Sequence, residues 1–343
     1  HASWLSSLTD EVAAWRARGQ EVILVSSGAV ALGRRYLGFK PGELRLEEKQ
    51  AAAAAGMIRL AHAYQERLGA HDTSVAQILL TLDDSENRRR YLNARSTLMT
   101  LLSVGAVPLI NENDTVATDE IRFGDNDRLA ARVAAMVSAD LLVLLSTIDG
   151  LYTADPHVDP TAKKIAEITE LTPEIEAMAG VSNSADARGG MVTKLVAAKL
   201  AMNAGCSMVI ADGRANNPLT ALEQEGSCTW FLAKSNPKTE RKTWIGGTLQ
   251  PAGVLIVDEG AAKALGQGRS MLPAGILDVT GHFQRGDAVA IKRRDGREIG
   301  RGLVNYSADD ARRIIGHKTD EIEGLLGYRG RDAMVHRDDL VVV

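Results

Sequence analysis

The chain has 343 residues, of which 45% are hydrophobic and 24% are charged, and its formal net charge is −4. These values are typical of globular proteins, and the length predicts two domains. The charge argues against a strongly nucleic-acid-binding or membrane-surface protein, and no apolar run reaches the roughly 18 residues of a membrane span. The two cysteines, Cys206 and Cys228, lack metal-ligand spacing. We therefore expect free thiols and a cytoplasmic protein.

The first two-thirds of the chain alternates helical patterns with short apolar strands. This alternation predicts an α/β fold in which helices sandwich an open, mostly parallel sheet. In chain order we expect a helix ending at Gly19, a strand at 21–25, a turn at 26–28 leading into a second helix, a helix at 57–68, a strand at 75–80, a helix at 91–104, a strand at 107–110, a helix at 127–137, a strand at 141–145, a helix at 192–204 and a strand at 207–210.

The pattern of alternating helices and strands ends near Phe231. A polar, proline-bearing stretch at 235–250 is typical of a linker. Beyond it the expected strands are short, at 254–257, 289–292 and 302–304, and Asp295-Gly296 is a tight-turn signal between two of them. We therefore expect a first domain at 1–234 and a small mostly-β barrel at 251–343.

A polar cluster follows the expected strand at 107–110. Asn111, Asn113 and Asp114 lie at its C-terminal end, where open α/β sheets bind their ligands. Asp114 can accept from an ammonium group, and asparagine amides can donate to a carboxylate, so the set suits an α-amino acid. A hydrogen-bonded polar turn explains one or two such residues but not the whole run.

A second polar cluster, Gly124-Asp125-Asn126-Asp127, comes directly before the helix at 127–137. One of these residues can cap that helix, and a cap needs only one. The excess predicts ligand contacts from Asp125 and Asn126, while Asp127 is a candidate to orient a catalytic lysine.

Two glycine-containing turns are candidates for binding anions. Ser26-Ser27-Gly28 joins a strand to a helix, a geometry that directs backbone N–H groups at an anion. Ser27 and Gly28 could hold a substrate carboxylate or lie near a transferred phosphoryl group, although an ordinary serine-capped turn has the same sequence. The stretch 188–194 is glycine-rich, opens a helix and carries Lys194, which suits a polyphosphate. A solvated helix lysine is the alternative.

These motifs, in collinear order, resemble the glutamate 5-kinase family, which joins an amino acid kinase fold to a C-terminal PUA domain. The resemblance extends through Gly150-Leu151-Tyr152-Thr153-Ala154-Asp155-Pro156 and into Val257-Asp258-Glu259-Gly260-Ala261 and His336-Arg337-Asp338-Asp339. It implies an enzyme that phosphorylates the side-chain carboxylate of L-glutamate with ATP, giving L-glutamyl 5-phosphate for proline biosynthesis. Such an acceptor needs no general base, because a glutamate side chain with a pKa of about 4.3 is already ionised.

The resemblance also implies roles for individual residues. Lys194 would neutralise the transferring phosphoryl group, with Asp127 beside it. The nucleotide would be bound by Ser146, Thr147, Arg188, Gly189, Gly190, Met191, Val192, Thr193 and Lys194. Further implications are Mg²⁺ arriving with ATP, feedback inhibition by proline and a homo-oligomer, either a dimer or a tetramer.

One departure from the family concerns its first strand. Family members begin with a strand that ends in a Lys-x-Gly-Ser-type loop around the ATP phosphates. This sequence opens at His1, inside what we expect to be the first helix. We therefore expect the natural protein to carry a strand that the printed sequence lacks.

Other functions compete with this interpretation. Acetylglutamate, aspartate, carbamate and UMP kinases share the fold, but Asp114 argues against an N-acetylated substrate, which has no ammonium group. The binding-class alternative is an RNA-binding protein that acts through its PUA-like module and retains an inactive kinase fold. Residues 251–343 contain 14 Lys or Arg and 14 Asp or Glu. RNA binding draws on basic excess, so we expect no RNA partner.

Overall fold

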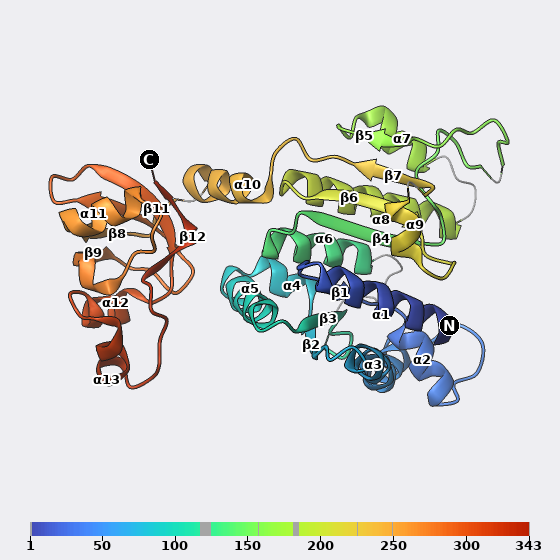
Figure 1. The fold of residues 1–343 in the computed structure, drawn as a ribbon, viewed down its shortest axis with the longest axis horizontal. Helices are drawn as coiled ribbons and strands as arrows, with labels where there is room; N and C mark the ends of the chain where they lie inside the picture. The colour runs from blue at the N-terminus through green and yellow to red at the C-terminus, as the bar shows by residue number, and fades with distance from the viewer. Residues whose placement is uncertain are drawn as a thin grey trace. The chain divides into compact units, whose positions relative to one another are not determined.

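The computed structural model describes residues 2–116, 125–156, 158–180, 185–224, 226–248 and 250–342. They form two compact units, His1–Asn236 and Pro237–Val343, which are drawn in Figure 1. None of the helices in these described ranges combines the length and the apolar character that a bilayer-crossing segment requires.

The first unit alternates helices with strands. Its elements are α1 (Ala2–Ala17), β1 (Leu24–Val25), α2 (Ala29–Tyr36), α3 (Leu46–Gly69), β2 (Val75–Leu80), α4 (Leu82–Glu86), α5 (Arg88–Ser103), β3 (Val107–Glu112), α6 (Asp125–Val137), β4 (Leu141–Ser146), β5 (Glu167–Ile168), α7 (Pro173–Gly180), α8 (Ala185–Asn203), β6 (Ser207–Asp212), α9 (Pro218–Glu223) and β7 (Cys228–Phe231).

The strands of this unit form two sheets, where the sequence predicted one open sheet. The first has the order β1-β3-β2 and is parallel throughout. The second has the order β4-β6-β7-β5, with β7 antiparallel to β6 and the other pairs parallel. The parallel α/β character expected from the alternating pattern is confirmed.

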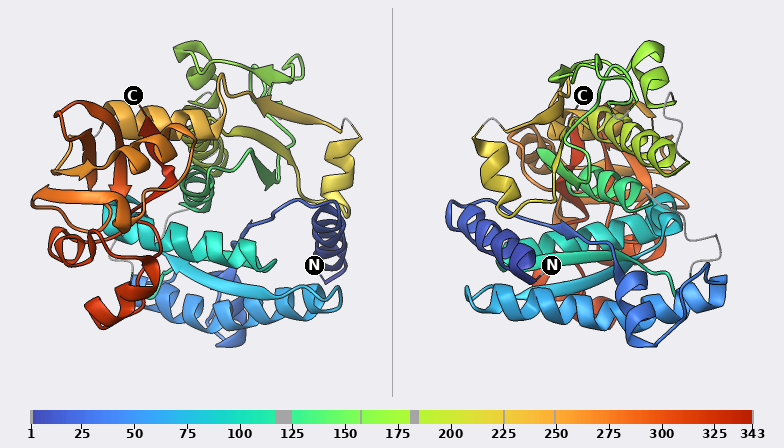
Figure 2. Two further views of the ribbon diagram at one scale, coloured as in Figure 1. Left: turned by 60° about the vertical axis from the view of Figure 1, so that its left-hand side comes forward. Right: turned by 90° about the vertical axis from the view of Figure 1, so that its right-hand side faces the viewer.

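Helix α6 packs against both sheets. Leu129, Val133 and Met136 join a core cluster with Ile110 of β3. Its alanines at 130, 131 and 134 join a second cluster, whose members include Leu144 of β4. One helix therefore serves two cores, and its large and small side chains are divided between them. Figure 2 shows α6 in green beside both groups of strands.

Helices α2 and α3, which lie next to the site, pack with their backbones in close contact. A Cβ added at Gly33 would lie 1.7 Å from the carbonyl oxygen of Ala52, and one added at Gly56 would lie 1.8 Å from that of Ala29. Two glycines thus let the helix backbones touch. The start of α2, directly after residues 26–28, is fixed by this contact.

Several element boundaries differ from those predicted. Helix α3 begins at Leu46 rather than 57, and α8 begins at Ala185 rather than 192. Strand β1 covers only Leu24–Val25, while β3 continues through Glu112, because its pairing with β2 extends to the Leu80–Glu112 pair.

The second unit is a five-stranded sheet with short helices. Its elements are α10 (Pro237–Thr243), the π-helix η1 (Trp244–Thr248), β8 (Gly253–Val257), α11 (Glu259–Gly266), η2 (Pro273–Gly275), β9 (Ile276–Gly281), β10 (Ala288–Arg293), β11 (Glu298–Val304), α12 (Ala308–Ile314), η3 (Thr319–Glu321), α13 (Ile322–Leu326) and β12 (Val335–Val342). The strand order is β12-β11-β10-β8-β9.

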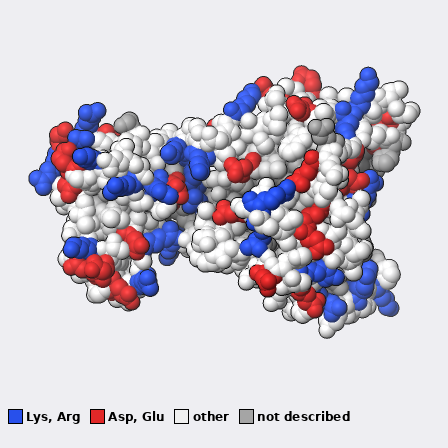
Figure 3. All heavy atoms as spheres, viewed as in Figure 1, with Lys and Arg blue, Asp and Glu red and all other residues white. Residues whose placement is uncertain are grey.

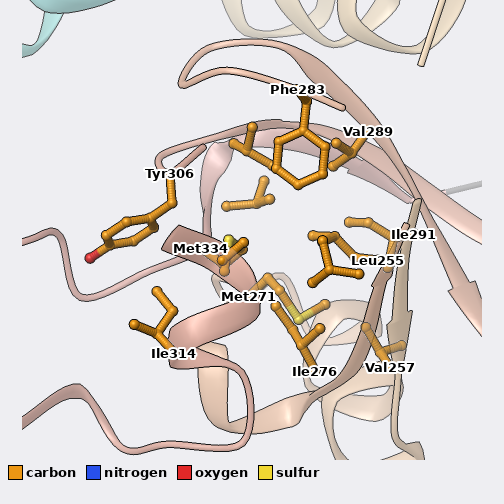
Figure 4. Packing of buried hydrophobic residues seen from close by; sticks show 14 of the residues in the cluster. Leu255, Val257, Met271, Ile276, Phe283, Val289, Ile291, Tyr306, Ile314 and Met334 are labelled. Carbon is orange, nitrogen blue, oxygen red and sulfur yellow. The ribbon is translucent and has the colours of Figure 1, made fainter. Parts of the chain in front are cut away.

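The core of this unit gathers side chains from all five of its strands and from α11, α12 and α13. Phe283, Leu255, Ile291 and Met334 point toward one another in Figure 4, and all are fully or almost fully buried. The tight turn predicted between β10 and β11 is present, with Gly296 at φ +84°. A positive φ is readily adopted by glycine, which explains that residue at this position.

The structure differs from the expected linker at 235–250. Residues 237–248 form α10 and η1, and this segment packs on strands of the second unit. Arg241 makes a buried ion pair with Asp339 of β12, with Nη2 2.5 Å from Oδ1 and each side chain only 7% exposed. Arg301 also donates to the carbonyl oxygen of Gly246 at 3.2 Å.

Candidate active site

The turn between β1 and α2 presents two residues to solvent. Ser26 is buried, whereas Ser27 and Gly28 are exposed. The backbone N–H of Ser26 donates to the carbonyl of Ile110 at 2.9 Å, which continues the pairing of β1 with β3. Gly28 has φ +95° and occupies the cap position of α2 without any side-chain cap bond. A serine-capped turn, the alternative suggested by the sequence, is therefore not what forms.

The end of β3 places two polar side chains in the interior. Asn111 is 3% exposed and Asp114 is 7% exposed. The Asn111 amide Nδ2 donates to the carbonyl oxygen of Ser26 at 2.7 Å. Asn113 lies further out, and its side-chain oxygen accepts from the Thr115 hydroxyl at 2.7 Å. Asn111 and Asp114 thus lie at the ligand-binding edge of the sheet, but Asn111 is bonded to the neighbouring turn.

A charge pair between a buried lysine and a half-buried aspartate connects α6 to α8. The Lys194 ammonium lies 3.0 Å from Asp127 Oδ2, and the two side chains are 11% and 19% exposed. The Thr193 hydroxyl lies 3.3 Å from the same carboxylate oxygen. Asn126 precedes Asp127 in the first turn of α6 and is half-buried. The contact supports the expectation that Asp127 orients Lys194.

The glycine-rich stretch does not form a loop before its helix. Gly189 and Gly190 lie inside α8, so Lys194 is more than two turns from the helix start instead of one. Interior backbone N–H groups of a helix bond to carbonyls four residues earlier, so only the first turn can offer them to a ligand. Met191 is half-buried and Val192 is exposed. The side chains of Asp125 and Arg188, the surroundings of Gly189 and all of Gly124 lie outside the described residues.

The ends of β4 and β6 lie side by side. Ser146 is paired with Asp212, and the N–H of Gly213 donates to the Ser146 carbonyl at 2.7 Å. A Cβ at Gly213 would lie 2.9 Å from that of Leu145, so a side chain there would crowd the strand end. Ser146 and the following Thr147 therefore emerge at a strand end, as the sequence predicted.

Asp149, which lies just beyond the end of β4, joins side chains from several parts of the first unit. Its carboxylate accepts hydrogen bonds from Ser227 and, at 3.0 Å, from Tyr152, and lies 3.5 Å from the Lys164 ammonium. Burial alone raises the pKa of Asp149, but these three partners outweigh burial and hold the pKa below its usual value. Ser227 lies 78 residues from Asp149, so no local sequence signal could reveal that contact.

The candidate residues form three contact groups around α6. The first is Ser26 with Asn111, the second is Asp127 with Lys194, and the third is the Ser146 strand end. They lie next to or on β1, β3, α8 and β4, all of which pack against α6. Among the described residues, no group of three or more His, Cys, Asp or Glu side chains is arranged to hold a metal ion.

These features together are those of a small-molecule kinase: a parallel sheet edge that carries buried polar groups for a substrate, next to a buried lysine for a phosphoryl group. Residues 2–212 match the amino acid kinase family and residues 253–326 match the PUA domain. The chain belongs to the amino acid kinase family.

Within that family, the similar proteins are glutamate 5-kinases. The one from Paramagnetospirillum magneticum is 66% identical, with 99% of this chain and 91% of the relative aligned. Those from Rhodospirillum rubrum and Agrobacterium fabrum are 59% and 60% identical, over 99% of this chain and 90% and 87% of the relatives. The resemblance inferred from the motifs is thereby confirmed.

Proposed function

We propose that this chain phosphorylates the side-chain carboxylate of L-glutamate with ATP, giving L-glutamyl 5-phosphate in the first step of proline biosynthesis. The observation that carries the proposal is the match to glutamate 5-kinases at 59–66% identity over 99% of the chain. The Lys194–Asp127 pair supports it, because a reaction between two anions requires a fixed cation.

The substrate half of the site lies at the ends of β1 and β3 and the start of α6. We assign the glutamate α-ammonium group to Asp114, whose carboxylate can accept from it. Ser27 and Gly28 hold a carboxylate at the start of α2, where backbone N–H groups and the helix dipole favour negative charge. Asp125 and Asn126 complete the polar wall from the start of α6 in this proposal.

Lys194 is the charge-neutralising group of the proposed mechanism. The side-chain carboxylate attacks the γ-phosphorus as an ionised nucleophile, its bond to phosphorus forms as the bond to the ADP leaving group breaks, and no proton needs to be removed. Asp127 and Thr193 limit the positions open to the Lys194 side chain. The ammonium group is then already placed when negative charge develops on the transferring oxygens.

The nucleotide half is formed by Ser146, Thr147 and α8 from Arg188 to Lys194. Ser146 lies at the strand end beside Asp212, and α8, which packs against α6, supplies Lys194. The described residues present no cage for Mg²⁺. We therefore expect Mg²⁺ to arrive with ATP, where it would offset phosphate charge, and no step above depends on a protein ligand for it. Feedback inhibition by proline and a dimeric or tetrameric assembly belong to the same proposal.

The decisive experiment is to trap the acyl phosphate with hydroxylamine. The protein would be incubated with ATP, Mg²⁺ and L-glutamate, with N-acetylglutamate and L-aspartate as comparison substrates. We expect hydroxamate from L-glutamate alone, because Asp114 requires an ammonium group. Product from N-acetylglutamate at an equal rate would overturn the substrate assignment, and no product from any acid would overturn the kinase assignment.

A matched pair of lysine variants tests the role of Lys194. Lys194→Met should lower kcat by about 10²- to 10³-fold, the usual loss when one preorganised charge-stabilising group is removed. Lys199→Met is the control, since Lys199 lies on the same helix but is 59% exposed and pairs with Glu176. Equal kcat losses in the two variants would contradict the assignment.

The charge of the second unit does not favour RNA binding as the main function. Residues 251–343 carry equal numbers of basic and acidic residues. Figure 3 shows Lys and Arg interspersed with Asp and Glu on the face of this unit that is in view. Without a basic excess, the phosphate term that dominates RNA affinity is weak. Filter binding with a salt titration would test this, and a steep salt slope would reverse the ranking.

A further inference from the structure

The turn at residues 26–28 has one inward and two outward residues. Ser26 is 7% exposed, while its neighbours Ser27 and Gly28 face solvent. Within this turn the Ser26 hydroxyl donates a long hydrogen bond to the Ser27 carbonyl oxygen, at 3.4 Å. The arrangement also depends on what holds Ser26 in the interior, and two side chains from outside the turn contact that residue.

The first contact comes from β3. Asn111 donates from Nδ2 to the backbone carbonyl of Ser26 at 2.7 Å, in a setting where both residues are buried. This bond lies one residue past the last β1–β3 pair, Val25–Ile110. Asn111 therefore adds a hydrogen bond between β3 and the turn, beyond the last pair of the sheet. Its Oδ1 is buried and has no hydrogen-bond partner among the described residues, so the side chain keeps one acceptor at the site.

The second contact comes from α3. Tyr64 is 6% exposed and packs in a core cluster with Ala29, the first residue of α2, and with Leu109 of β3. Burial raises the pKa of Tyr64, and the nearby Ser26 side chain opposes part of that rise. The ring thus supports the elements on both sides of the turn, and the hydroxyl reaches the turn itself.

We propose that Tyr64 and Asn111 are positioning residues for Ser26. Asn111 holds its backbone carbonyl and Tyr64 its side chain, so that Ser27 and Gly28 remain exposed to bind glutamate. We name this set of three, Ser26, Tyr64 and Asn111, the Ser26 clamp. The inference rests on the proposed function for its substrate. It assigns Tyr64 a role in substrate binding. It also implies that the main role of Asn111 is to fix the conformation of the turn and not to contact the ligand.

The geometry explains why the clamp should act on substrate binding and not on chemistry. Its bonds end on Ser26, and the charge pair of Lys194 and Asp127 involves other elements. Loss of one bond therefore lets the turn sample other conformations before glutamate binds. Binding must then restore the ordered turn, which raises KM for glutamate and leaves KM for ATP and kcat near their original values.

The test uses variants that remove single groups. Tyr64→Phe deletes only the hydroxyl and keeps the packed ring, and should raise KM for glutamate about fivefold, as expected for one net hydrogen bond. Tyr306→Phe is the matched control. Tyr306 is equally well buried in the second unit, and its hydroxyl donates to the Arg331 carbonyl. This variant loses a comparable bond and should leave every kinetic constant unchanged.

A double-mutant cycle separates positioning from independent ligand contact. If Tyr64 and Asn111 both act through Ser26, the KM increase of Tyr64→Phe combined with Asn111→Ala should be smaller than the product of the two single increases. A KM ratio equal to that product would overturn the shared clamp. A matched fall in kcat for Tyr64→Phe would also overturn it, because a positioning role predicts a change in glutamate KM alone.

Hydrogen exchange of the free protein provides a readout that does not depend on activity. The Ser26 amide, bonded to the Ile110 carbonyl, and the Leu32 amide, bonded to the Gly28 carbonyl, should exchange faster in Tyr64→Phe than in the unaltered protein, and unchanged exchange of both would overturn the clamp. If the unaltered protein forms no acyl phosphate, the proposed function fails, while faster exchange in the variant would still support the clamp. The two failures are thereby distinguishable.

Discussion

Replacing Gly33 by alanine should disturb both the packing of the first unit and the substrate-binding turn. The new Cβ would lie 1.7 Å from the carbonyl oxygen of Ala52, where real Cβ contacts below 3.0 Å are essentially never seen. The obstacle is backbone within α3, which cannot rotate away as a side chain can. Helix α2 must therefore move from α3 by at least the difference of 1.3 Å.

The magnitude follows from that displacement. Overpacking a core costs about 1–3 kcal/mol, and a backbone obstacle places this variant near the upper limit. Helix α2 begins one residue after Gly28, so its movement also shifts Ser27 and Gly28. A misplacement of about 1 Å can cost as much as 10²-fold in rate. We therefore expect a fall of about 10- to 100-fold in kcat/KM for glutamate.

The loss in free energy of unfolding can be measured by urea denaturation, monitored by tryptophan fluorescence. Trp4 and Trp15 lie in α1 and pack in one cluster with Leu68 of α3, so they report on this part of the first unit. The control is Gly69→Ala at the end of α3, where nothing lies within 4 Å of the added Cβ. It should be neutral or stabilise by up to about 1 kcal/mol. If Gly33→Ala kept both the urea midpoint and kcat/KM of the unaltered protein, the close-contact argument would be refuted.

Three further predictions concern charge and thiol chemistry. Arg241→Met should destabilise the second unit by about 3–5 kcal/mol in thermal or urea unfolding, because it leaves Asp339 buried without its cation; adding Asp339→Leu should recover much of the loss, and no recovery would contradict the pairing. Asp149→Asn should cost about 1 kcal/mol at neutral pH. Since the folded pKa of Asp149 lies below its unfolded value, its contribution is present above about pH 4 and is lost as pH falls through the folded pKa, so the stabilities of the two proteins should converge at pH values below that folded pKa. Burial raises the pKa of Cys206 to about 12 and raises that of Cys228 less, so iodoacetamide at pH 8 should label Cys228 slowly and Cys206 only after unfolding, as mass spectrometry would show.

The sequence predicted most strands closely, and its errors have physical reasons. Strand β2 was predicted over 75–80 and forms at Val75–Leu80, because β-branched and aliphatic residues bounded by turns leave few alternatives. The start of α3 was missed because residues 51–55 are all alanine, which favours helix without giving an apolar periodicity. The start of α8 was missed because Gly189-Gly190 argues against a helix interior, and packing of α8 against α6 overrides that local cost.

In the candidate site, too, some contacts were predicted from sequence motifs and others were not. The pairing of Asp127 with Lys194 was anticipated from their motifs, although 67 residues separate them. The contacts of Asp149 and the bond from Asn111 to Ser26 were not anticipated. The Ser227–Asp149 and Asn111–Ser26 bonds join residues 78 and 85 positions apart, and these residue types are common in turns. A side chain at the end of a strand can face a ligand or a neighbouring turn, and only the three-dimensional register of β1 and β3 decides between them.

The ion pair between Arg241 and Asp339 has a consequence for how this protein can be divided. The PUA match begins at residue 253, yet the cation that balances Asp339 comes from α10, well before it. A fragment cut at the start of the match would lose the Arg241 guanidinium from beside the buried Asp339 carboxylate. The piece that could be exchanged between proteins, or studied alone, starts at Pro237. A recombination point that keeps this ion pair lies upstream of α10.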